Sequence, residues 1–189
     1  MARFEPALES IKQMTYDKPT CGEQKLLDML EGLDNSFEIF FQPHINIAHP
    51  DIVILRKNCG CLIIEVKDWN LSSYQRTGSD KLKGKNADYY VASPFEQVQN
   101  YKSALFNRFS PSMHIGLMKN EHVFGVVVAG VFFSNATDQQ VTELFGEQAV
   151  IANGEKKYKR FHPFWTMQDS AGSIVERINS ILTFSSSTP

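Results

Sequence analysis

The sequence predicts an α/β fold in which helices flank a central mixed β-sheet. This prediction rests on the order of the segments: a helix, three short β-rich strands, a second helix, a longer apolar strand and further short elements. A length of 189 residues fits one compact domain. We expect a lead-in over residues 1–19, one domain over 20–183, and a flexible tail or linker over 184–189, where the chain is rich in serine.

Charge and composition exclude several classes of protein. The chain has 19 basic and 21 acidic residues, so it does not coat nucleic acid through a general positive charge. The N-terminus lacks a basic segment followed by an apolar run, and the longest apolar stretch, at 123–133, is too short to span a membrane. The three cysteines lack the spacing of a zinc site. We therefore expect a soluble, cytoplasmic protein that makes no contact with a membrane.

Two helices carry clear start signals. Thr20 and Glu23 form the capping-box pattern, and leucines follow at helical spacing. In the second helix, Ser93 is the expected N-cap and Pro94 the first helical residue, and the helix runs to about residue 109. A third, amphipathic helix is expected at 170–182.

The strands are short apolar runs separated by turn residues. Residues 68–93 are polar and predict a long loop or hairpin excursion, and 123–133 predict a central strand covered on both faces. One or two short strands are expected within 148–161. The three strands of the first group are predicted at 37–41, 51–55 and 61–67.

Three ionisable residues on two of these strands form the strongest candidate site. In the strand at 61–67, a period of two residues places Glu65 and Lys67 on one face and apolar residues on the other. Charges on a largely buried strand are costly unless they are paired or bind a metal. A hairpin return would bring Asp51 beside Glu65, where a divalent cation would keep both carboxylates ionised. The competing interpretation, which an isolated Glu-x-Lys favours, is a solvated pair at a strand end.

The same residues resemble a known nuclease signature. Pro50-Asp51 followed by Glu65-x-Lys67 resembles the PD-(D/E)xK motif. Two longer motifs resemble the nuclease-related (NERD) domain in particular: Gly22-Glu23-Gln24 and Glu65-Val66-Lys67-Asp68-Trp69. The resemblance covers about residues 20–135, and its specificity comes from the order and strand placement of the motifs. It implies a restriction-endonuclease-like core and Mg²⁺-dependent phosphodiester cleavage, with Mn²⁺ as a substitute cofactor.

The resemblance also implies roles for individual residues. Asp51 and Glu65 would be metal ligands together with the carbonyl of Val66, because Mg²⁺ prefers oxygen ligands. Lys67 would orient or deprotonate the attacking water, or offset charge on the phosphoryl oxygens. Glu23 has two open interpretations: it caps a helix, or it approaches the metal as a further acidic ligand.

The second helix carries a motif that resembles Q-x-x-x-Y of recombination helicase-nucleases. Gln97 and Tyr101 lie one turn apart on one face. Gln97 would contact the metal-bound water or the scissile phosphate, and Tyr101 would support it or touch the nucleic-acid backbone. The alternative is an ordinary amphipathic helix with Tyr101 packed in the core.

Two basic clusters are candidate nucleic-acid contacts, because lysine and arginine bind phosphates and neighbouring tyrosines stack on bases. Each cluster taken singly is also typical of a solvated loop. The predicted contact residues are Arg76, Lys81, Lys83 and Lys85 in the first cluster and Lys157 in the second.

Together these observations predict a metal-dependent nuclease that hydrolyses DNA, in repair or in defence against foreign DNA. The motifs do not separate DNA from RNA, or internal from terminal cleavage. The alternative is a catalytically silent module with a nuclease fold that binds DNA or docks a partner. A third interpretation makes this chain the N-terminal domain of a longer, helicase-linked protein, because NERD-like domains often precede helicase motors.

Overall fold

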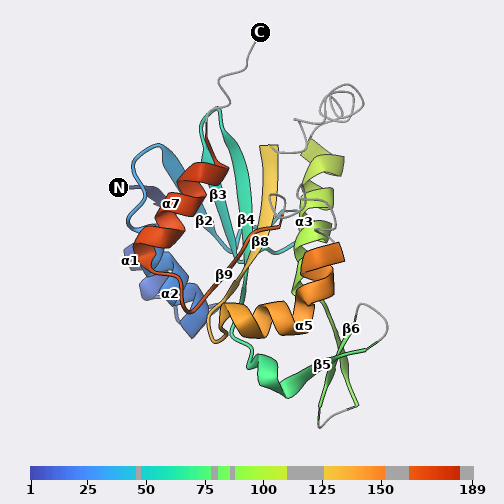
Figure 1. The fold of residues 1–189 in the computed structure, drawn as a ribbon. Coiled ribbons are helices and arrows are strands. Elements are labelled where there is room, and N and C mark those ends of the chain that lie inside the picture. The colour runs from blue at the N-terminus through green and yellow to red at the C-terminus, as the bar shows by residue number, and fades with distance from the viewer. Residues whose placement is uncertain (46–47, 78–80, 86–87, 110–125, 152–161, 184–189) are drawn as a thin grey trace, which may run out of the picture.

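A mixed six-stranded sheet forms the centre of the molecule (Figure 1). The computed structural model describes residues 1–45, 48–77, 81–85, 88–109, 126–151 and 162–183. The strand order in the sheet is β1-β2-β3-β4-β8-β9. Its strands are β1 (Arg3–Glu5), β2 (Phe37–Phe41), β3 (Ile52–Arg56), β4 (Gly60–Lys67), β8 (Val127–Phe133) and β9 (Phe164–Thr166). The α/β class and the helix-flanked mixed sheet predicted from the sequence are confirmed.

Helices cover both faces of this sheet, so that the molecule has three layers, with the sheet in the middle. One apolar cluster joins the sheet to α1, α2 and α7, and the other joins it to α3 and α5. The helices are α1 (Leu8–Lys12), α2 (Cys21–Leu30), α3 (Pro94–Phe109), α5 (Asp138–Ile151) and α7 (Ala171–Ile181). The central strands β4 and β8 are apolar almost throughout because both of their faces are covered. In the described residues, no helix is long and apolar enough to cross a membrane.

The β3–β4 hairpin sets which side chains share a face. Ile52 lies opposite Ile64, and the pairing continues without a break to Arg56 opposite Gly60. The connecting turn needs left-handed backbone, with φ of 62° at Asn58 and 134° at Gly60. A side chain at Gly60 would also place a Cβ 2.3 Å from the carbonyl oxygen of Val126. This turn therefore fixes the register that brings the start of β3 to the end of β4.

The excursion after β4 forms a small sheet of its own. A 3-10 helix, η1 (Leu71–Ser73), leads into three antiparallel strands at the end of the central sheet where β4 stops (Figure 1). These strands are β5 (Tyr74–Arg76), β6 (Lys81–Gly84) and β7 (Tyr90–Ala92). The polar composition of residues 68–93 thus predicted an excursion, and the structure adds its three strands.

Three segments differ from the sequence predictions. The prediction of a strand within 148–161 is wrong for residues 148–151, which end helix α5. A short apolar run has no period by which a strand can be told from a helix. Residues 152–161 lie outside the described residues. Helix α5 itself and strand β9 were not predicted. The expected lead-in at 1–19 contains β1 and α1, which join the sheet and the core although each is too short to show a pattern. The predicted tail at 184–189 and the first residues of the predicted strand at 123–133 also lie outside the described part of the chain.

Candidate active site

The candidate site lies at the edge of the central sheet that the ends of the strands form, at the carboxyl end of β4. β2, β4 and β8 all end at this edge, and β3 starts there, because β3 runs antiparallel to its two neighbours while β4 and β8 are parallel. Residues that immediately precede or follow these strands are therefore neighbours in space. Ligands commonly bind at such an edge in open α/β sheets.

Asp51 and Glu65 meet at this edge as the sequence predicted. Asp51 directly precedes β3, opposite the residue that follows Ile64 in β4. Its Oδ2 accepts a hydrogen bond from the backbone N–H of Val66 at 2.7 Å. Glu65 is 4% exposed, and it shares its face of β4 with Ile63 rather than with Leu62, Ile64 and Val66, which pack in the other cluster.

Lys67, Gln97 and Tyr101 complete a chain of hydrogen bonds around Glu65. Glu65 Oε1 accepts from Lys67 Nζ at 2.6 Å and from Gln97 Nε2 at 2.7 Å. Gln97 also donates to the hydroxyl of Tyr101 at 2.7 Å, and this hydroxyl donates to the carbonyl of His49 at 3.2 Å. The Q-x-x-x-Y face of α3 therefore points at the carboxylate of Glu65, and the predicted contact of Gln97 with a water or a phosphate stays a prediction.

Glu23 caps α2, and its carboxylate also lies near the site, while its role as a metal ligand stays a prediction. It belongs to the capping box of α2: Thr20 Oγ1 accepts from the backbone N–H of Glu23 at 3.2 Å, and Glu23 Oε2 accepts from the backbone N–H of Thr20 at 2.6 Å. Its Oε1 accepts a hydrogen bond at 3.1 Å from Nε2 of Gln42, which is the residue that follows β2. The side chain is only 3% exposed, and its charge acts on Asp51. Glu23 is thus both a cap and a third carboxylate beside the site.

The acidic groups perturb one another. Burial raises the pKa of Asp51 to about 8, and the charges of Glu65 and Glu23 push in the same direction against the hydrogen bond from Val66. Burial also raises the pKa of Glu65, although the ammonium of Lys67 opposes this shift. Burial raises the pKa of Tyr101 to about 12, so its hydroxyl stays protonated and can donate to His49.

The carboxylates satisfy one requirement of a cation site. Glu65 Oε2 is fully buried and has no hydrogen-bond partner in the described residues, and a buried carboxylate oxygen without a partner is costly. Two neighbouring carboxylates, one with a free oxygen, suit a hard divalent cation. Within the described residues, no three His, Cys, Asp or Glu side chains are arranged to hold a metal by themselves. A cation here would therefore need backbone oxygen and water in addition to side chains.

Asp68 joins the start of α2 to the end of β8 beside the site, a role that the sequence motifs did not assign to it. Its Oδ2 accepts from the backbone N–H of Gly22 in the first turn of α2 at 3.1 Å, and its Oδ1 accepts from the hydroxyl of Ser134, which follows β8. Asn135 donates to the Asp68 carbonyl at 3.1 Å. The approach is so close that a Cβ on Gly22 would lie 1.9 Å from Asp68 Oδ1. The signal in the sequence was the pair of NERD-like motifs that contain Gly22 and Asp68.

The predicted basic contacts of the first cluster lie on the small sheet. Arg76 ends β5, Lys81 and Lys83 lie on β6, and Lys85 follows β6. Lys83 is close to the ring of Tyr90, with its Nζ 5.8 Å from the ring centroid, and pairs with Asp88 at 3.0 Å. Trp69 links this sheet to the site, because it stacks on Tyr74 at 5.0 Å and lies 5.4 Å from the ammonium of Lys67. Lys157 lies outside the described residues.

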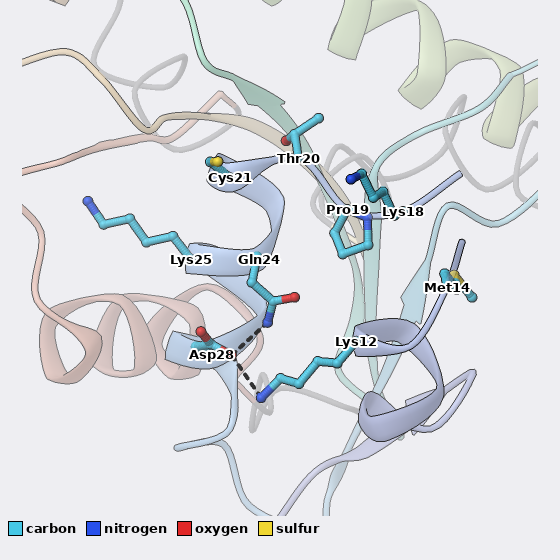
Figure 2. A pocket seen from close by; sticks show the side chains of 9 residues that line it. All are labelled: Lys12, Met14, Lys18, Pro19, Thr20, Cys21, Gln24, Lys25 and Asp28. Atoms are coloured by element: carbon cyan, nitrogen blue, oxygen red, sulfur yellow. Dashed lines mark hydrogen bonds and ion pairs between the residues drawn. The ribbon is translucent and has the colours of Figure 1, made fainter. Parts of the chain in front are cut away.

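A pocket on the outer side of α2 is a second feature that the sequence did not indicate. It has a volume of about 510 Å³ and lies between α1 and α2 (Figure 2). Three lysines line it, but they are scattered over the sequence as Lys12, Lys18 and Lys25 rather than forming a run. Lys12 comes from α1, whereas Lys18 and Lys25 come from the segment before α2 and from α2 itself.

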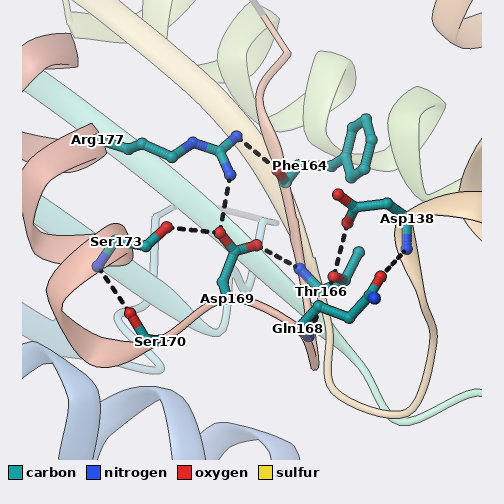
Figure 3. Close-up of polar contacts among 8 residues, drawn as sticks. All are labelled: Asp138, Phe164, Thr166, Gln168, Asp169, Ser170, Ser173 and Arg177. Carbon is teal, nitrogen blue, oxygen red and sulfur yellow. Dashed lines mark hydrogen bonds and ion pairs between the residues drawn. The ribbon is translucent and has the colours of Figure 1, made fainter.

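Another polar cluster, at the far edge of the sheet, is structural. Arg177 of α7 donates to Asp169 at 3.2 Å and to the carbonyl of Phe164 at 2.7 Å, and Asp169 accepts from the backbone N–H of Thr166 at 2.9 Å (Figure 3). Asp138, the first residue of α5, accepts from the Thr166 hydroxyl at 2.7 Å. These bonds fasten the short edge strand β9 to α5 and α7, and every member of the cluster finds its partner inside it.

A family model described as NERD, nuclease-related domain, matches residues 18–130, more than half of the chain. The chain belongs to the NERD family. The match confirms the resemblance seen in the sequence, and the matched region contains Asp51, Glu65, Lys67, Gln97 and Tyr101. Comparisons with curated proteins and with solved structures found no match. Membership of the NERD family supports a nuclease-related function.

Proposed function

We propose that this NERD domain is a metal-dependent nuclease of the PD-(D/E)xK type that hydrolyses phosphodiester bonds, with DNA as its substrate. The observation that carries the proposal is the meeting of Asp51, Glu65 and Lys67 at one edge of the sheet, where burial and mutual repulsion raise the pKa of Asp51 to about 8. Two neighbouring buried carboxylates are costly in their ionised forms, and a bound divalent cation would offset that cost.

The proposed cofactor is Mg²⁺, with Mn²⁺ as a substitute. Asp51 and Glu65 are the side chains proposed to hold it, with the carbonyl of Val66, and it would supply Lewis-acid activation of a water and of the phosphate. Glu23 is a further candidate ligand. Each of its oxygens accepts one hydrogen bond, from Thr20 or from Gln42, which leaves a second lone pair on each oxygen.

The remaining residues position groups and balance charge. Lys67 lies within hydrogen-bond distance of Glu65, so its ammonium is available to orient a water and to offset negative charge on the phosphoryl oxygens. Gln97 holds Glu65 in place through one N–H and Tyr101 through the other. The Tyr101 hydroxyl in turn anchors the loop before Asp51 through the carbonyl of His49.

The polyanionic substrate would be guided by the small sheet. Its lysines and exposed tyrosines match the side chains that bind phosphates and stack on bases, and Tyr89 and Tyr90 are each more than half exposed. Trp69 connects this surface to Lys67. The helicase linkage expected from the resemblance stays a prediction.

The proposal is tested by incubating the purified chain with end-labelled single- and double-stranded DNA, and with RNA, in Mg²⁺, in Mn²⁺ and in EDTA. We expect cleavage of DNA that depends on the divalent cation. Asp51→Ala and Lys67→Ala should each lower the rate by at least about 100-fold. The exposed carboxylate variant Glu38→Gln is the matched control and should cleave at the wild-type rate.

Two outcomes would overturn the proposal. DNA binding without cleavage in either cation would favour the silent binding module instead. Cleavage that survives in both Asp51→Ala and Lys67→Ala would show that the activity comes from another protein in the preparation.

A further inference from the structure

The pocket between α1 and α2 lies directly behind the proposed site. Glu23, in the first turn of α2, is buried against Gln42 and its charge acts on Asp51, while Thr20, Cys21 and Gln24 beside it line the pocket. Thr20 belongs to both sides, because it lines the pocket and its backbone N–H donates to Glu23 Oε2 at 2.6 Å. A ligand in this pocket would therefore be separated from the site only by the N-terminal turn of α2.

The charges around the pocket are unbalanced. Lys12 reaches across from α1 and pairs with Asp28 at 3.0 Å and with Glu31 at 3.3 Å (Figure 2). Neither Lys18 nor Lys25 takes part in an ion pair with any described residue. Lys18 lies on the segment that leads into α2, and Lys25 lies on the helix itself. Figure 2 shows the ammonium groups of Lys18 and Lys25 on opposite sides of the first turn of α2. They could therefore contact different phosphates of one strand, but not a single small anion.

The phosphates would be held by these side chains more than by the end of the helix. Two of the first three backbone N–H groups of α2 are already occupied, since Gly22 donates to Asp68 and Glu23 donates to Thr20. Met14 and Pro19 add apolar surface to the lining. A volume of about 510 Å³ is within the usual range of ligand pockets.

We propose that this pocket binds the phosphodiester backbone of the nucleic-acid strand at a position beyond the scissile bond, through Lys18 and Lys25. This inference rests on the proposed function, because it assigns to the substrate a second contact surface, on the α2 side of the site. The small sheet lies at the end of β4, so the two surfaces contact the strand from different elements of the fold. A strand of nucleic acid is the one ligand that carries phosphates to both.

The test is the salt dependence of binding, measured in EDTA so that no cleavage occurs. Lys18→Gln and Lys25→Gln, singly and together, are compared with wild type for binding of a fluorescent single-stranded oligonucleotide. Removing one lysine–phosphate interaction should weaken binding and lower the slope of log K against log salt by about 0.7, and the double variant should lower it by about 1.4. Lys57→Gln is the matched control, because Lys57 is an exposed lysine in the β3–β4 turn, at the opposite end of the sheet. It should bind as wild type does.

Cys21 provides a second readout that needs no variant. It lines the pocket and its thiol is exposed, so bound oligonucleotide should slow its reaction with a maleimide. Inorganic phosphate and a mononucleotide serve as competitors that separate a free phosphate ligand from a strand. Protection by the oligonucleotide at concentrations where neither competitor protects is the expected result.

Three results would overturn this inference. The first is a salt slope that is unchanged in the double variant. The second is a Cys21 that stays reactive under saturating oligonucleotide, and the third is protection by inorganic phosphate alone at the same concentration. If DNA is still cleaved in any of these cases, the proposed nuclease function stands and only the second contact surface fails. If wild type binds no nucleic acid at all, both proposals fail together.

Discussion

A side chain at Gly22 should destabilise the protein although it improves the helix. Gly22 is the second residue of α2, where alanine is intrinsically better than glycine by up to about 1 kcal/mol. Its Cβ, however, would lie 1.9 Å from Asp68 Oδ1 and 2.8 Å from the Cβ of Ser134, far inside the ordinary contact range of 3.4–4 Å. Asp68 must then swing away and give up its bonds to Gly22 and Ser134. Hydrogen bonds to a charged group contribute roughly 1.5–3 kcal/mol each, so the loss exceeds the gain.

We therefore expect Gly22→Ala to lower the free energy of unfolding by about 2 kcal/mol, or the Tm by roughly 4–8 °C for a chain of this length. Thermal and urea unfolding, followed by circular dichroism in EDTA, measure this loss. The control is Gly172→Ala. Gly172 is the second residue of α7, it is exposed, and the nearest atom to its new Cβ is Ser170 Oγ at 3.9 Å. The control should be as stable as wild type or more stable by up to about 1 kcal/mol.

A double variant tests the cause of the loss. In an Asp68→Ala background the closest clashing atom is gone, so Gly22→Ala should cost clearly less than it does in wild type. The reasoning is refuted if Gly22→Ala is as stable as wild type, or if Gly22→Ala and Gly172→Ala shift the Tm by the same amount. It is also refuted if the cost of Gly22→Ala is the same with and without Asp68.

Two further predictions follow from the buried titratable groups. The pKa of Asp51 is raised from 3.8 to about 8, so the folded protein holds this proton more tightly than the unfolded chain, and the resulting stability is present below about pH 4 and lost as the pH rises to 8. In EDTA, Asp51→Asn should therefore gain Tm relative to wild type between pH 4 and pH 8, by at least about 2–4 °C, and a difference that does not change with pH would contradict this. Burial raises the pKa of Cys61 to about 12, so at pH 8 a maleimide should label exposed Cys21 quickly and Cys61 only on unfolding, as peptide mass spectrometry can show. Rapid labelling of Cys61 in the native protein would count against its burial.

Local sequence patterns predicted the part of the site that local geometry controls. Two rules predict that Asp51, Glu65 and Lys67 lie close together: side chains alternate along a strand, and a hairpin returns the chain beside itself. The structure places the three residues as these rules require. The helix starts at Thr20 and Ser93 were predicted from capping chemistry, and the helix bounds that follow from them agree with the structure. Each of these features depends on residues that are near one another in the sequence.

The missed parts depend on contacts between distant segments. Ser134 reaches Asp68 across 66 residues because β8 lies parallel to β4, and nothing in either segment alone indicates this. Lys12 of α1 likewise reaches Asp28 of α2 only because the two helices pack together. Helix α5 escaped prediction because its apolar residues are irregularly spaced and end in a short run that also suits a strand.

The turn at Asn58 and Gly60 governs chemistry at the opposite end of its hairpin. Because alternate side chains of a strand face opposite ways, an insertion or deletion here that slides β3 along β4 by one residue would turn Asp51 to the far side of the sheet. The hairpin could still form, but the two acids would no longer face one another. Changes in the length of this turn should therefore be absent from any homologue that has the proposed activity.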